Sequence, residues 1–310
     1  MIVPVRNAIL YLPAVIPALS REVERYGDAE LIVVESCSTD DSLAWLRARG
    51  GLRLLENVPG RVGAVRNAGA AAATGDVLSF VDADCEPLPG LLGQVAEALE
   101  RTGASACGSP YDLPLAPSWV EATWQGLHEP GRDGWVTYLP AGNFHVRREA
   151  FALAGGFRED LSSGEDAELG QRMTRAGLKT WNERRIAVRH LGNPKTLRSF
   201  FRKQRWHGAG MFGTVTWGAI DLPVVNTFLH LVFLVATVPV ALLVRPPIGL
   251  ALALLLPWII PIAAVAYRSL QIRNVWRPLR SILLYQLYFL ARLTALRDIV
   301  VGREHREARA

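Results

Sequence analysis

The sequence contains little cysteine, little lysine and a low share of charged residues. Three cysteines, Cys37, Cys85 and Cys107, are scattered along 310 residues without a CxxC pair. They exclude a disulfide framework and a zinc cluster, and a reducing compartment is the expected environment. Charged residues make up only 20% of the chain and hydrophobic residues 50%. This balance excludes an intrinsically disordered chain and a collagen-like one.

The apolar residues are concentrated near the C-terminus. Mean hydropathy is +0.17, which is high for a soluble protein. The segments 227–244 and 248–267 contain no Asp, Glu, Lys or Arg. The length allows one large domain or two ordinary ones, so the size of the core is not limiting. A freely soluble globular protein is therefore not expected.

Basic residues gather around these apolar segments, in 195–205, 268–280 and 292–309, although the net charge is only +5. Clusters in this position suit anionic lipid headgroups better than a nucleic-acid groove, so no nucleic-acid partner is predicted. No signal peptide precedes the strand-like segment 2–5, and the N-terminus is expected in the cytoplasm.

Short apolar runs alternate with helical patterns in the first third of the chain. Strands are predicted at 2–5, 31–35, 52–56, 77–81 and 105–108, and helices at 10–26, 41–49, 62–73 and 88–101. This alternation predicts an α/β fold with a doubly wound, mostly parallel sheet, in which ligands bind at the carboxyl ends of the strands. Further along, a helix at 166–175 and a strand at 186–190 are predicted.

The sequence changes character after Pro194, so we expect a first domain over residues 1–194. Aromatic and basic residues are mixed at the start of region 195–225, which predicts a basic amphipathic helix at a membrane interface. A solvated basic helix packed on the globular domain is the alternative. The uncharged segments 226–244 and 248–267 are long enough to form a transmembrane helical hairpin.

The charges that flank this hairpin predict its orientation. Four arginines between positions 268 and 280 follow the second span, whereas Arg245 alone lies between the spans. The positive-inside rule therefore returns the chain to the cytoplasm after the hairpin. Region 268–310 is predicted to form a basic loop, an interfacial or re-entrant helix at 281–301, and an Arg-rich tail.

Polar residues follow the predicted strands. Glu35 lies at the carboxyl edge of the second strand, and Thr39 or Asp40 is predicted to cap the helix after it. Arg66 lies in a helix of small residues that can pack closely on the sheet. Its planar donor fork suits phosphate or a base edge. Simple helix packing is the alternative explanation for this segment.

The triplet Asp82-Ala83-Asp84 ends a buried strand. Two carboxylates two residues apart repel one another unless a cation or donor groups lie between them. A hard divalent ion completed by diphosphate oxygens is the usual solution. Asp-x-Asp also occurs by chance in turns, so the triplet alone does not establish a metal site.

Glu165 and Asp166 open the helix that follows Gly164. Acidic residues there stabilise the helix macrodipole, and a carboxylate fixed by backbone donors is also a rigid, correctly aimed base. His190 ends a strand-like segment, where a histidine is more often structural than a ligand. Each motif therefore has an ordinary structural explanation when it is taken alone.

In their order along the chain, the motifs resemble the family-2 glycosyltransferases, which have the GT-A fold. The resemblance covers about the first 210 residues. It is carried by the segments 2–7, 34–40, 64–75, 82–84, 142–157 and 164–172. The ordered set is specific where the single motifs are not.

The resemblance implies a role for each matching residue. The donor nucleotide sugar would be bound by Pro4, Arg6, Glu35, Arg66, Asp82, Ala83, Asp84 and Arg205. Asp84 and His190 would hold a divalent cation, Mn or Mg, and Asp166 would be the general base. The acceptor or sugar pocket would contain Gly142, Asn143, Glu165 and Trp206.

The sequence departs from the family pattern at two points. Arg202 stands where the Gln-x-x-Arg-Trp motif of membrane-bound synthases has glutamine, which argues against a processive polymerase. Glu35-Ser36 stands where the family usually has two aspartates. A carboxylate at position 35 can accept from uracil or from guanine, so it does not choose between UDP- and GDP-linked donors.

The implied function is inverting transfer of a sugar to an acceptor hydroxyl by a hexosyltransferase-type enzyme of the cytoplasmic membrane. The catalytic domain, 1–194, would face the cytoplasm. The hairpin favours a membrane lipid or a lipid-linked acceptor in cell-envelope glycan biosynthesis. Two alternatives stay open. One is a metal-dependent nucleotidyltransferase, which releases pyrophosphate, and the other is a membrane-anchored binding module without activity.

Overall fold

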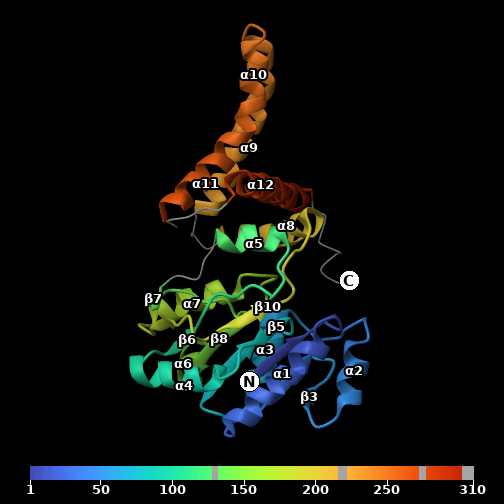
Figure 1. Cartoon of the computed structure of the whole chain (residues 1–310), viewed down its shortest axis with the longest axis vertical. Helices are drawn as coiled ribbons and strands as arrows, with labels where there is room; N and C mark the ends of the chain where they lie inside the picture. The colour runs from blue at the N-terminus through green and yellow to red at the C-terminus, as the bar shows by residue number, and fades with distance from the viewer. Residues whose placement is uncertain (128–131, 216–221, 272–276, 302–310) are drawn as a thin grey trace. The chain divides into compact units, whose positions relative to one another are not determined.

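The computed structural model of the chain describes residues 1–127, 132–215, 222–271 and 277–301 (Figure 1). The chain folds into two compact units. The first consists of Met1–Leu115 and Pro130–Asn193, and the second of Ala116–Glu129 and Pro194–Ala310. The boundary between the units after Asn193 lies next to Pro194, where the composition of the sequence changes. The grouping of Ala116–Glu129 with the C-terminal unit has no counterpart in the sequence pattern.

The first unit is built on an eight-stranded sheet. In spatial order, its strands are β3 (Arg53–Leu55), β2 (Ile32–Glu35), β1 (Ile2–Val5), β4 (Val77–Val81), β8 (Asn143–Arg147), β6 (Ala106–Gly108), β9 (Thr180–Asn182) and β7 (Gly134–Val136). Strands β3, β2, β1 and β4 are parallel, and β6 is parallel to β9. Strand β8 runs antiparallel between β4 and β6, and β7 runs antiparallel to β9. The predicted α/β class with a mostly parallel sheet is confirmed.

Helices bury both faces of this sheet. Val3 and Val33 pack on one side with α1 (Leu12–Tyr26), α2 (Ser42–Arg49) and α4 (Leu91–Thr102). Ile2 and Ile32, their neighbours in sequence, pack on the other side with α3 (Val62–Ala72), α6 (Arg148–Ala154) and α7 (Glu165–Arg175). All four strand residues are fully buried. Burial on both faces is what makes parallel strands read as continuous apolar runs.

Glycine allows α3 to approach the sheet closely. A Cβ atom on Gly69 would lie only 3.0 Å from Cγ2 of Val34 in β2. The expectation of a small-residue helix packed tightly on the sheet is confirmed. The position of this helix directs the side chain of Arg66, three residues earlier, toward the carboxyl end of β4.

The predicted cap of α2 is wrong. Asp41 is the N-cap residue, and its side chain makes no capping hydrogen bond. Asp40 instead accepts from the backbone N–H of Ser42 at 3.0 Å and from that of Ile9 at 3.2 Å. The Asp40 carboxylate therefore joins the loop after β1 to the loop after β2, a tertiary role that local capping rules do not anticipate.

A second, two-stranded sheet lies close to the end of β4. It pairs β5 (Cys85–Pro87) with β10 (Val188–His190) in antiparallel orientation, and His190 is directly opposite Cys85. This pairing brings a histidine from late in the chain to the Asp82-Ala83-Asp84 triplet.

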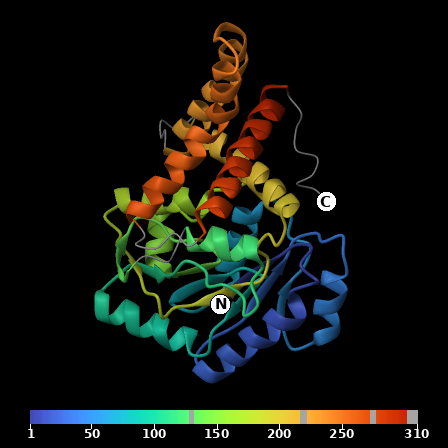
Figure 2. The same ribbon diagram turned by 45° about the horizontal axis from the view of Figure 1, so that its top comes forward.

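The second unit is helical (Figure 2). It contains α5 (Trp119–Gly126), α8 (Leu197–Val215), α9 (Leu222–Leu243), α10 (Ile248–Leu255), the 3-10 turn η1 (Leu256–Trp258), α11 (Ile259–Gln271) and α12 (Pro278–Val300). Its aromatic core surrounds Trp124 of α5, whose ring lies 4.9 Å from that of Phe200 and 5.5 Å from that of Tyr288. Gly208 allows α8 to approach α12, because a Cβ there would lie 3.1 Å from that of Ala295.

Two helical segments of this unit are long and apolar enough to cross a membrane. Leu222–Leu243 has a mean hydropathy of 2.0, and Ile248–Gln271, which runs through α10, η1 and α11, has 2.4. They form the two arms of a hairpin (Figure 1). Among the described residues no third helix meets the same criterion. Helix α12 packs along α8 instead, and the predicted Arg-rich tail lies outside the described residues after Val301.

Candidate active site

A buried arginine links the end of β4 to the start of α7. Arg66 is only 4% exposed, and its Nη2 donates to Oδ1 of Asp82 at 2.6 Å. Its Nη1 donates to Oε1 of Glu165 at 2.5 Å. Burial alone opposes the charged form, but the two carboxylates raise the pKa of Arg66 further above its ordinary value. In this structure Arg66 bridges two acidic residues, and its predicted role toward phosphate or a base edge stays a prediction.

Asp166, the second residue of α7, has a perturbed carboxylate. Oδ2 accepts from the backbone N–H of Ala141 at 3.2 Å and faces the Tyr138 hydroxyl at 3.5 Å, while Oδ1 accepts from the N–H of Ala167 at 2.8 Å. Burial and the neighbouring Glu165 raise the pKa of Asp166 to about 6, although Arg66 and the backbone donors oppose this shift. A carboxylate with a pKa near neutrality is suited to accept a proton.

The turn before β8 holds both acidic segments. Ala141 donates to Asp166, and the carbonyl of the next residue, Gly142, accepts from the N–H of Asp82 at 3.4 Å. The N–H of Gly142 donates to the Tyr111 hydroxyl at 3.2 Å. A Cβ atom on Gly142 would lie 2.5 Å from both Oδ2 of Asp82 and the Tyr111 hydroxyl oxygen. Glycine is therefore required for this packing, and the turn ties Asp82 and Asp166 to one peptide segment.

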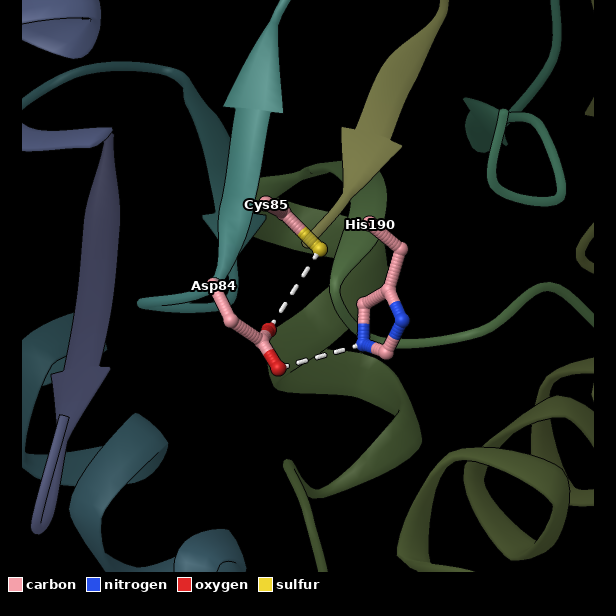
Figure 3. Close-up of side chains that lie close together, drawn as sticks. All are labelled: Asp84, Cys85 and His190. Carbon is pink, nitrogen blue, oxygen red and sulfur yellow. Dashed lines mark hydrogen bonds and ion pairs between the residues drawn. The ribbon is translucent and has the colours of Figure 1, made fainter. Parts of the chain in front are cut away.

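Asp84 lies beside two potential metal ligands (Figure 3). Nε2 of His190 is 3.3 Å from Oδ2 of Asp84, and the Cys85 thiol is 3.8 Å from Oδ1. The Tyr111 ring stacks on His190, with ring centroids 4.6 Å apart, and holds the imidazole in place. A carboxylate oxygen and an imidazole nitrogen are suitable ligands for a divalent cation. The residues present therefore fit the cation that the sequence resemblance implies.

The predicted nucleotide-binding residues lie at the carboxyl ends of the central strands. Glu35 is fully buried, and its carboxylate accepts from the N–H of Ser38 at 2.6 Å and from that of Asn57 at 3.1 Å. Pro4 is half-buried within β1, and Arg6 directly after that strand is exposed. Ala83 is buried in the turn between the two aspartates.

Asn143, predicted for the sugar pocket, has a fully buried side chain. Its Nδ2 donates to the carbonyls of Ser109 at 2.9 Å and Ile186 at 2.8 Å, and its Oδ1 lies 3.0 Å from Nε2 of His145. Burial lowers the pKa of His145 to about 3, so this imidazole is neutral and its Nε2 donates. The side chain of Asn143 thus supports the start of β8, directly after Gly142.

The two predicted residues of α8 belong to the second unit. Nε of Arg205 lies 3.1 Å from Oδ2 of Asp298 in α12, and Trp206 is 39% exposed. Their roles toward a donor or a sugar stay predictions.

Sequence reasoning missed three side chains of the site. Tyr111 contacts Gly142 and His190, Tyr138 faces Asp166, and Cys85 lies beside Asp84. Cys85 could have been noticed because it directly follows the acidic triplet. The tyrosines carry no local signal, since their contacts are with residues 28 or more positions away.

Comparison with known proteins identifies the family. Residues 1–153 match the family described as glycosyl transferase family 2. Residues 1–153 therefore form a domain of this family. Two curated relatives, the pre-mycofactocin glycosyltransferases of Mycobacterium tuberculosis strains CDC 1551 / Oshkosh and ATCC 25618 / H37Rv, are each 29% identical over 155 residues. The match covers 47% of this chain and only 33% of each relative.

Solved structures share the fold of this chain at low sequence identity. A mannosyltransferase from Pyrobaculum calidifontis, solved with GDP-Man and Mn²⁺, has a TM-score of 0.61 at 17% identity over 98% of this chain and 87% of its own. GalNAc-T7, solved with UDP, GalNAc and Mn²⁺, has a TM-score of 0.50 at 17% identity over 67% of this chain and 49% of its own. The predicted GT-A-like α/β fold is confirmed.

Proposed function

We propose that this chain is an inverting glycosyltransferase that moves a sugar from a nucleotide-diphosphate sugar to an acceptor hydroxyl. Family membership supports sugar transfer. The observation that carries the mechanism is the Asp166 carboxylate, whose pKa is about 6 and which shares a turn with Asp82. A base of this strength beside an Asp-x-Asp triplet suits removal of a proton from an alcohol.

The acidic residues of the site have different roles in this proposal. Arg66 compensates the charges of Asp82 and Glu165, so Asp166 is the carboxylate of this group that is available as a base. Asp84 and His190 would hold the divalent cation, Mn²⁺ or Mg²⁺, which when bound stabilises negative charge on the leaving diphosphate. The mannosyltransferase and GalNAc-T7 structures were both solved with Mn²⁺, which supports testing this ion first.

The reaction is a direct displacement at the anomeric carbon. The acceptor oxygen forms its bond to that carbon as the bond to the diphosphate oxygen breaks, and the configuration inverts. Asp166 accepts the proton of the acceptor hydroxyl during this step. General base catalysis of this kind contributes about 10²–10⁴-fold to the rate.

Glu35, Pro4 and Arg6 would bind the nucleotide at the carboxyl ends of β1 and β2. The structural neighbours hold GDP-Man and UDP, so both nucleotide classes belong in a first screen. Predicted contributions of Arg205 and Trp206 to the donor and sugar sites remain part of the proposal.

We also propose that the enzyme is attached to the cytoplasmic membrane through the hairpin of α9 with α10 and α11. Large apolar side chains on both arms are exposed, including Val235 at 64% and Leu254 at 74%. Exposed apolar surface of this extent suits lipid contact. An acceptor delivered by the membrane, such as a lipid-linked sugar, fits this attachment.

The test is turnover of a panel of UDP- and GDP-linked sugars with Mn²⁺ or Mg²⁺. The proposal expects a metal-dependent release of nucleoside diphosphate, and a product whose anomeric configuration is opposite to that of the donor. Release of pyrophosphate would instead identify a nucleotidyltransferase. Absence of both metal-dependent turnover and nucleotide-sugar binding would identify an inactive module.

A further inference from the structure

The Asp84–His190 pair has a third neighbour that the proposed reaction does not use. Cys85 is fully buried, and its Sγ lies 3.8 Å from Oδ1 of Asp84 (Figure 3). Its strand, β5, pairs with β10 so that Cys85 is directly opposite His190. Side chains of directly opposite residues project from the same face of an antiparallel pair. Strand pairing therefore places the thiol and the imidazole together.

The spacing of the three side chains suits one cation. One ligand atom from each of Asp84, Cys85 and His190 lies within 4.8 Å of the other two. Bonds of about 2.0–2.3 Å in a tetrahedral site separate neighbouring ligand atoms by roughly 3.3–3.8 Å. The distance of 3.3 Å from Nε2 of His190 to Oδ2 of Asp84 falls in this range, and Sγ of Cys85 lies 3.8 Å from the other oxygen of the same carboxylate, Oδ1.

Neighbouring residues hold this cluster in shape, and one of its members is partly exposed. Tyr111 stacks on the imidazole, which fixes the direction of Nε2. A Cβ atom on Gly192 would overlap the Asp84 carboxylate, so glycine at this position is required for the carboxylate to lie where it does. The Asp84 side chain is 25% exposed, which provides a route for an ion to a cluster whose other two members are buried.

We propose that Cys85 is a third cation ligand, which makes the donor-site metal centre a mixed oxygen, nitrogen and sulfur site. The inference rests on the proposed function only in taking Asp84 and His190 as cation ligands. Thiolate ligands favour thiophilic ions, whereas carboxylates suit Mg²⁺ and Mn²⁺. The site therefore binds Co²⁺, Zn²⁺ and Cd²⁺ more tightly than an Asp–His pair alone does. Binding releases the thiol proton to solvent as the metal–sulfur bond forms.

The decisive measurement is the absorption spectrum of full-length protein with Co²⁺, in the absence of any nucleotide sugar. The measurement uses a variant with the substitutions Cys37→Ser and Cys107→Ala, so that Cys85 is its only thiol. We expect a sulfur-to-cobalt charge-transfer band in the near ultraviolet that saturates at one ion per chain. A spectrum without this band at saturating Co²⁺, or no binding of Co²⁺, would overturn the inference.

Further substitutions assign the band and the selectivity. In Cys85→Ser the band is lost and Co²⁺ affinity falls about tenfold or more, while Mg²⁺ affinity changes less than about twofold because sulfur contributes little to binding this ion. Cys107→Ala alone is the matched control, since Cys107 is buried and its thiol contacts the carbonyl of Val95. Equal Co²⁺ affinities in Cys85→Ser and Cys107→Ala would contradict the assignment.

This test is independent of sugar transfer. A protein that shows the band but transfers no sugar would refute the proposed function and leave the cysteine ligand in place. A protein that transfers sugar but shows no band would do the reverse. Because the main measurement leaves Cys85 unchanged, misfolding of Cys85→Ser cannot obscure the result.

Discussion

At the scale of single residues, two adjacent carboxylates at the start of α7 have different environments. Glu165 is neutralised by Arg66 at 2.5 Å, whereas Asp166 receives backbone donors and keeps a pKa raised to about 6. Burial and the charge of Glu165 disfavour ionisation of Asp166. Different environments for two neighbouring acids are what the proposed role of Asp166 as the base requires.

The pH dependence of the reaction should report this base. Asp166 acts only when it is deprotonated, so kcat should rise with pH and reach half its plateau near pH 6. An ordinary aspartate would give the same limb near pH 4. A kcat profile measured at saturating donor and acceptor checks this. A rate that is constant between about pH 5 and pH 8 would contradict the raised pKa.

Asp166→Asn should lower kcat by about 10²–10⁴-fold and leave donor affinity unchanged. It should not lower the melting temperature at neutral pH. The folded-state pKa of Asp166 lies above the unfolded value, so ionisation above pH 6 favours the unfolded chain, and stability increases as pH falls through 6. Turnover, donor binding and thermal denaturation measure these effects. Asp160→Asn is the matched control, because Asp160 is an exposed aspartate in the segment that precedes α7.

Gly142→Ala should reduce activity at least tenfold by displacing the carboxylate of Asp82. The added Cβ would lie 2.5 Å from that carboxylate and from the Tyr111 hydroxyl, and overpacking of this kind forces neighbours to move. Gly93→Ala, in α4, is the control, since a Cβ there meets nothing within 4 Å. Steady-state kinetics of the two variants decide the point, and equal activity would show that the turn tolerates a side chain.

At the scale of elements, the sequence pattern predicts the strands that are buried on both faces and the helices between them. β1, β2 and β4 are short apolar runs with polar residues after them, and α1 to α4 have helical spacing, so local rules suffice. Strands β5, β7, β8 and β9 depend on partners far along the chain, which periodicity does not reveal.

The residues of the candidate site, too, are predictable from the sequence only where a local motif marks them. Asp82, Asp84 and Asp166 are recognisable from motif order, and Glu35 from its place at a strand end. The bridge through Arg66 and the positions of Tyr111 and Cys85 follow from the antiparallel insertion of β8 and the pairing of β5 with β10. These pairings depend on the tertiary structure, and the residues involved have no regular spacing in the sequence.

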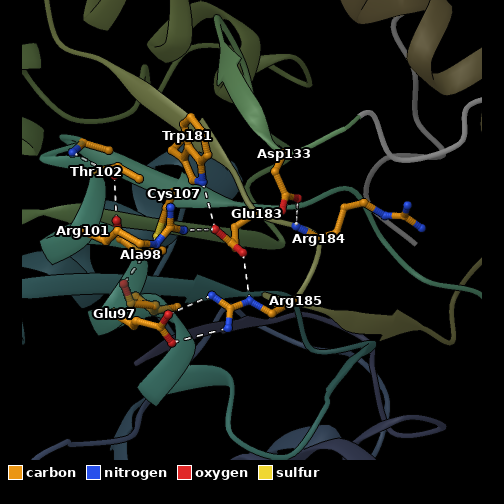
Figure 4. A network of polar contacts seen from close by, with 12 residues as sticks. Glu97, Ala98, Arg101, Thr102, Cys107, Asp133, Trp181, Glu183, Arg184 and Arg185 are labelled. Atoms are coloured by element: carbon orange, nitrogen blue, oxygen red, sulfur yellow. Dashed lines mark hydrogen bonds and ion pairs between the residues drawn. The ribbon is translucent and has the colours of Figure 1, made fainter.

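Glu183 connects the end of β9 to α4 through a polar network (Figure 4). It is 2% exposed and accepts from Nε1 of Trp181 at 2.9 Å, from Nε of Arg185 at 2.9 Å and from Arg101. Despite burial, these donors lower the pKa of Glu183, so its stabilising effect is present at neutral pH and is lost as pH falls through that lowered pKa.

Glu183→Gln should therefore destabilise the fold by about 2 kcal/mol at neutral pH, because charge-assisted hydrogen bonds are lost in a buried position. The loss should shrink in acid, where the wild-type carboxylate is itself protonated. Urea denaturation at neutral and acidic pH measures both. Glu97→Gln changes an exposed member of the same network, at 53% exposure, and should cost less than about 0.5 kcal/mol. Equal losses would refute the role given to burial.

At the scale of the whole molecule, the hairpin should determine where the protein resides. Val235→Arg places a charge on an exposed position of α9, at an expected cost of about 2.5–3.5 kcal/mol if that position lies at the bilayer centre. The fraction recovered with washed membranes should fall. Leu153→Arg, at an exposed apolar position of α6, should leave this fraction unchanged. Equal recovery of both variants would contradict membrane insertion of α9.

The grouping of α5 with the C-terminal helices has a practical consequence. The polypeptide passes between the two units three times, after residues 115, 129 and 193. Severing the gene at position 194 would yield a fragment that retains Val120, Trp124 and Leu127 but has lost Phe200, Tyr285 and Tyr288, the aromatic rings that surround them. Such a fragment would expose apolar surface and tend to aggregate. For the same reason, exchanging residues 1–193 or residues 194–310 as one contiguous block between related proteins would disrupt the helical unit.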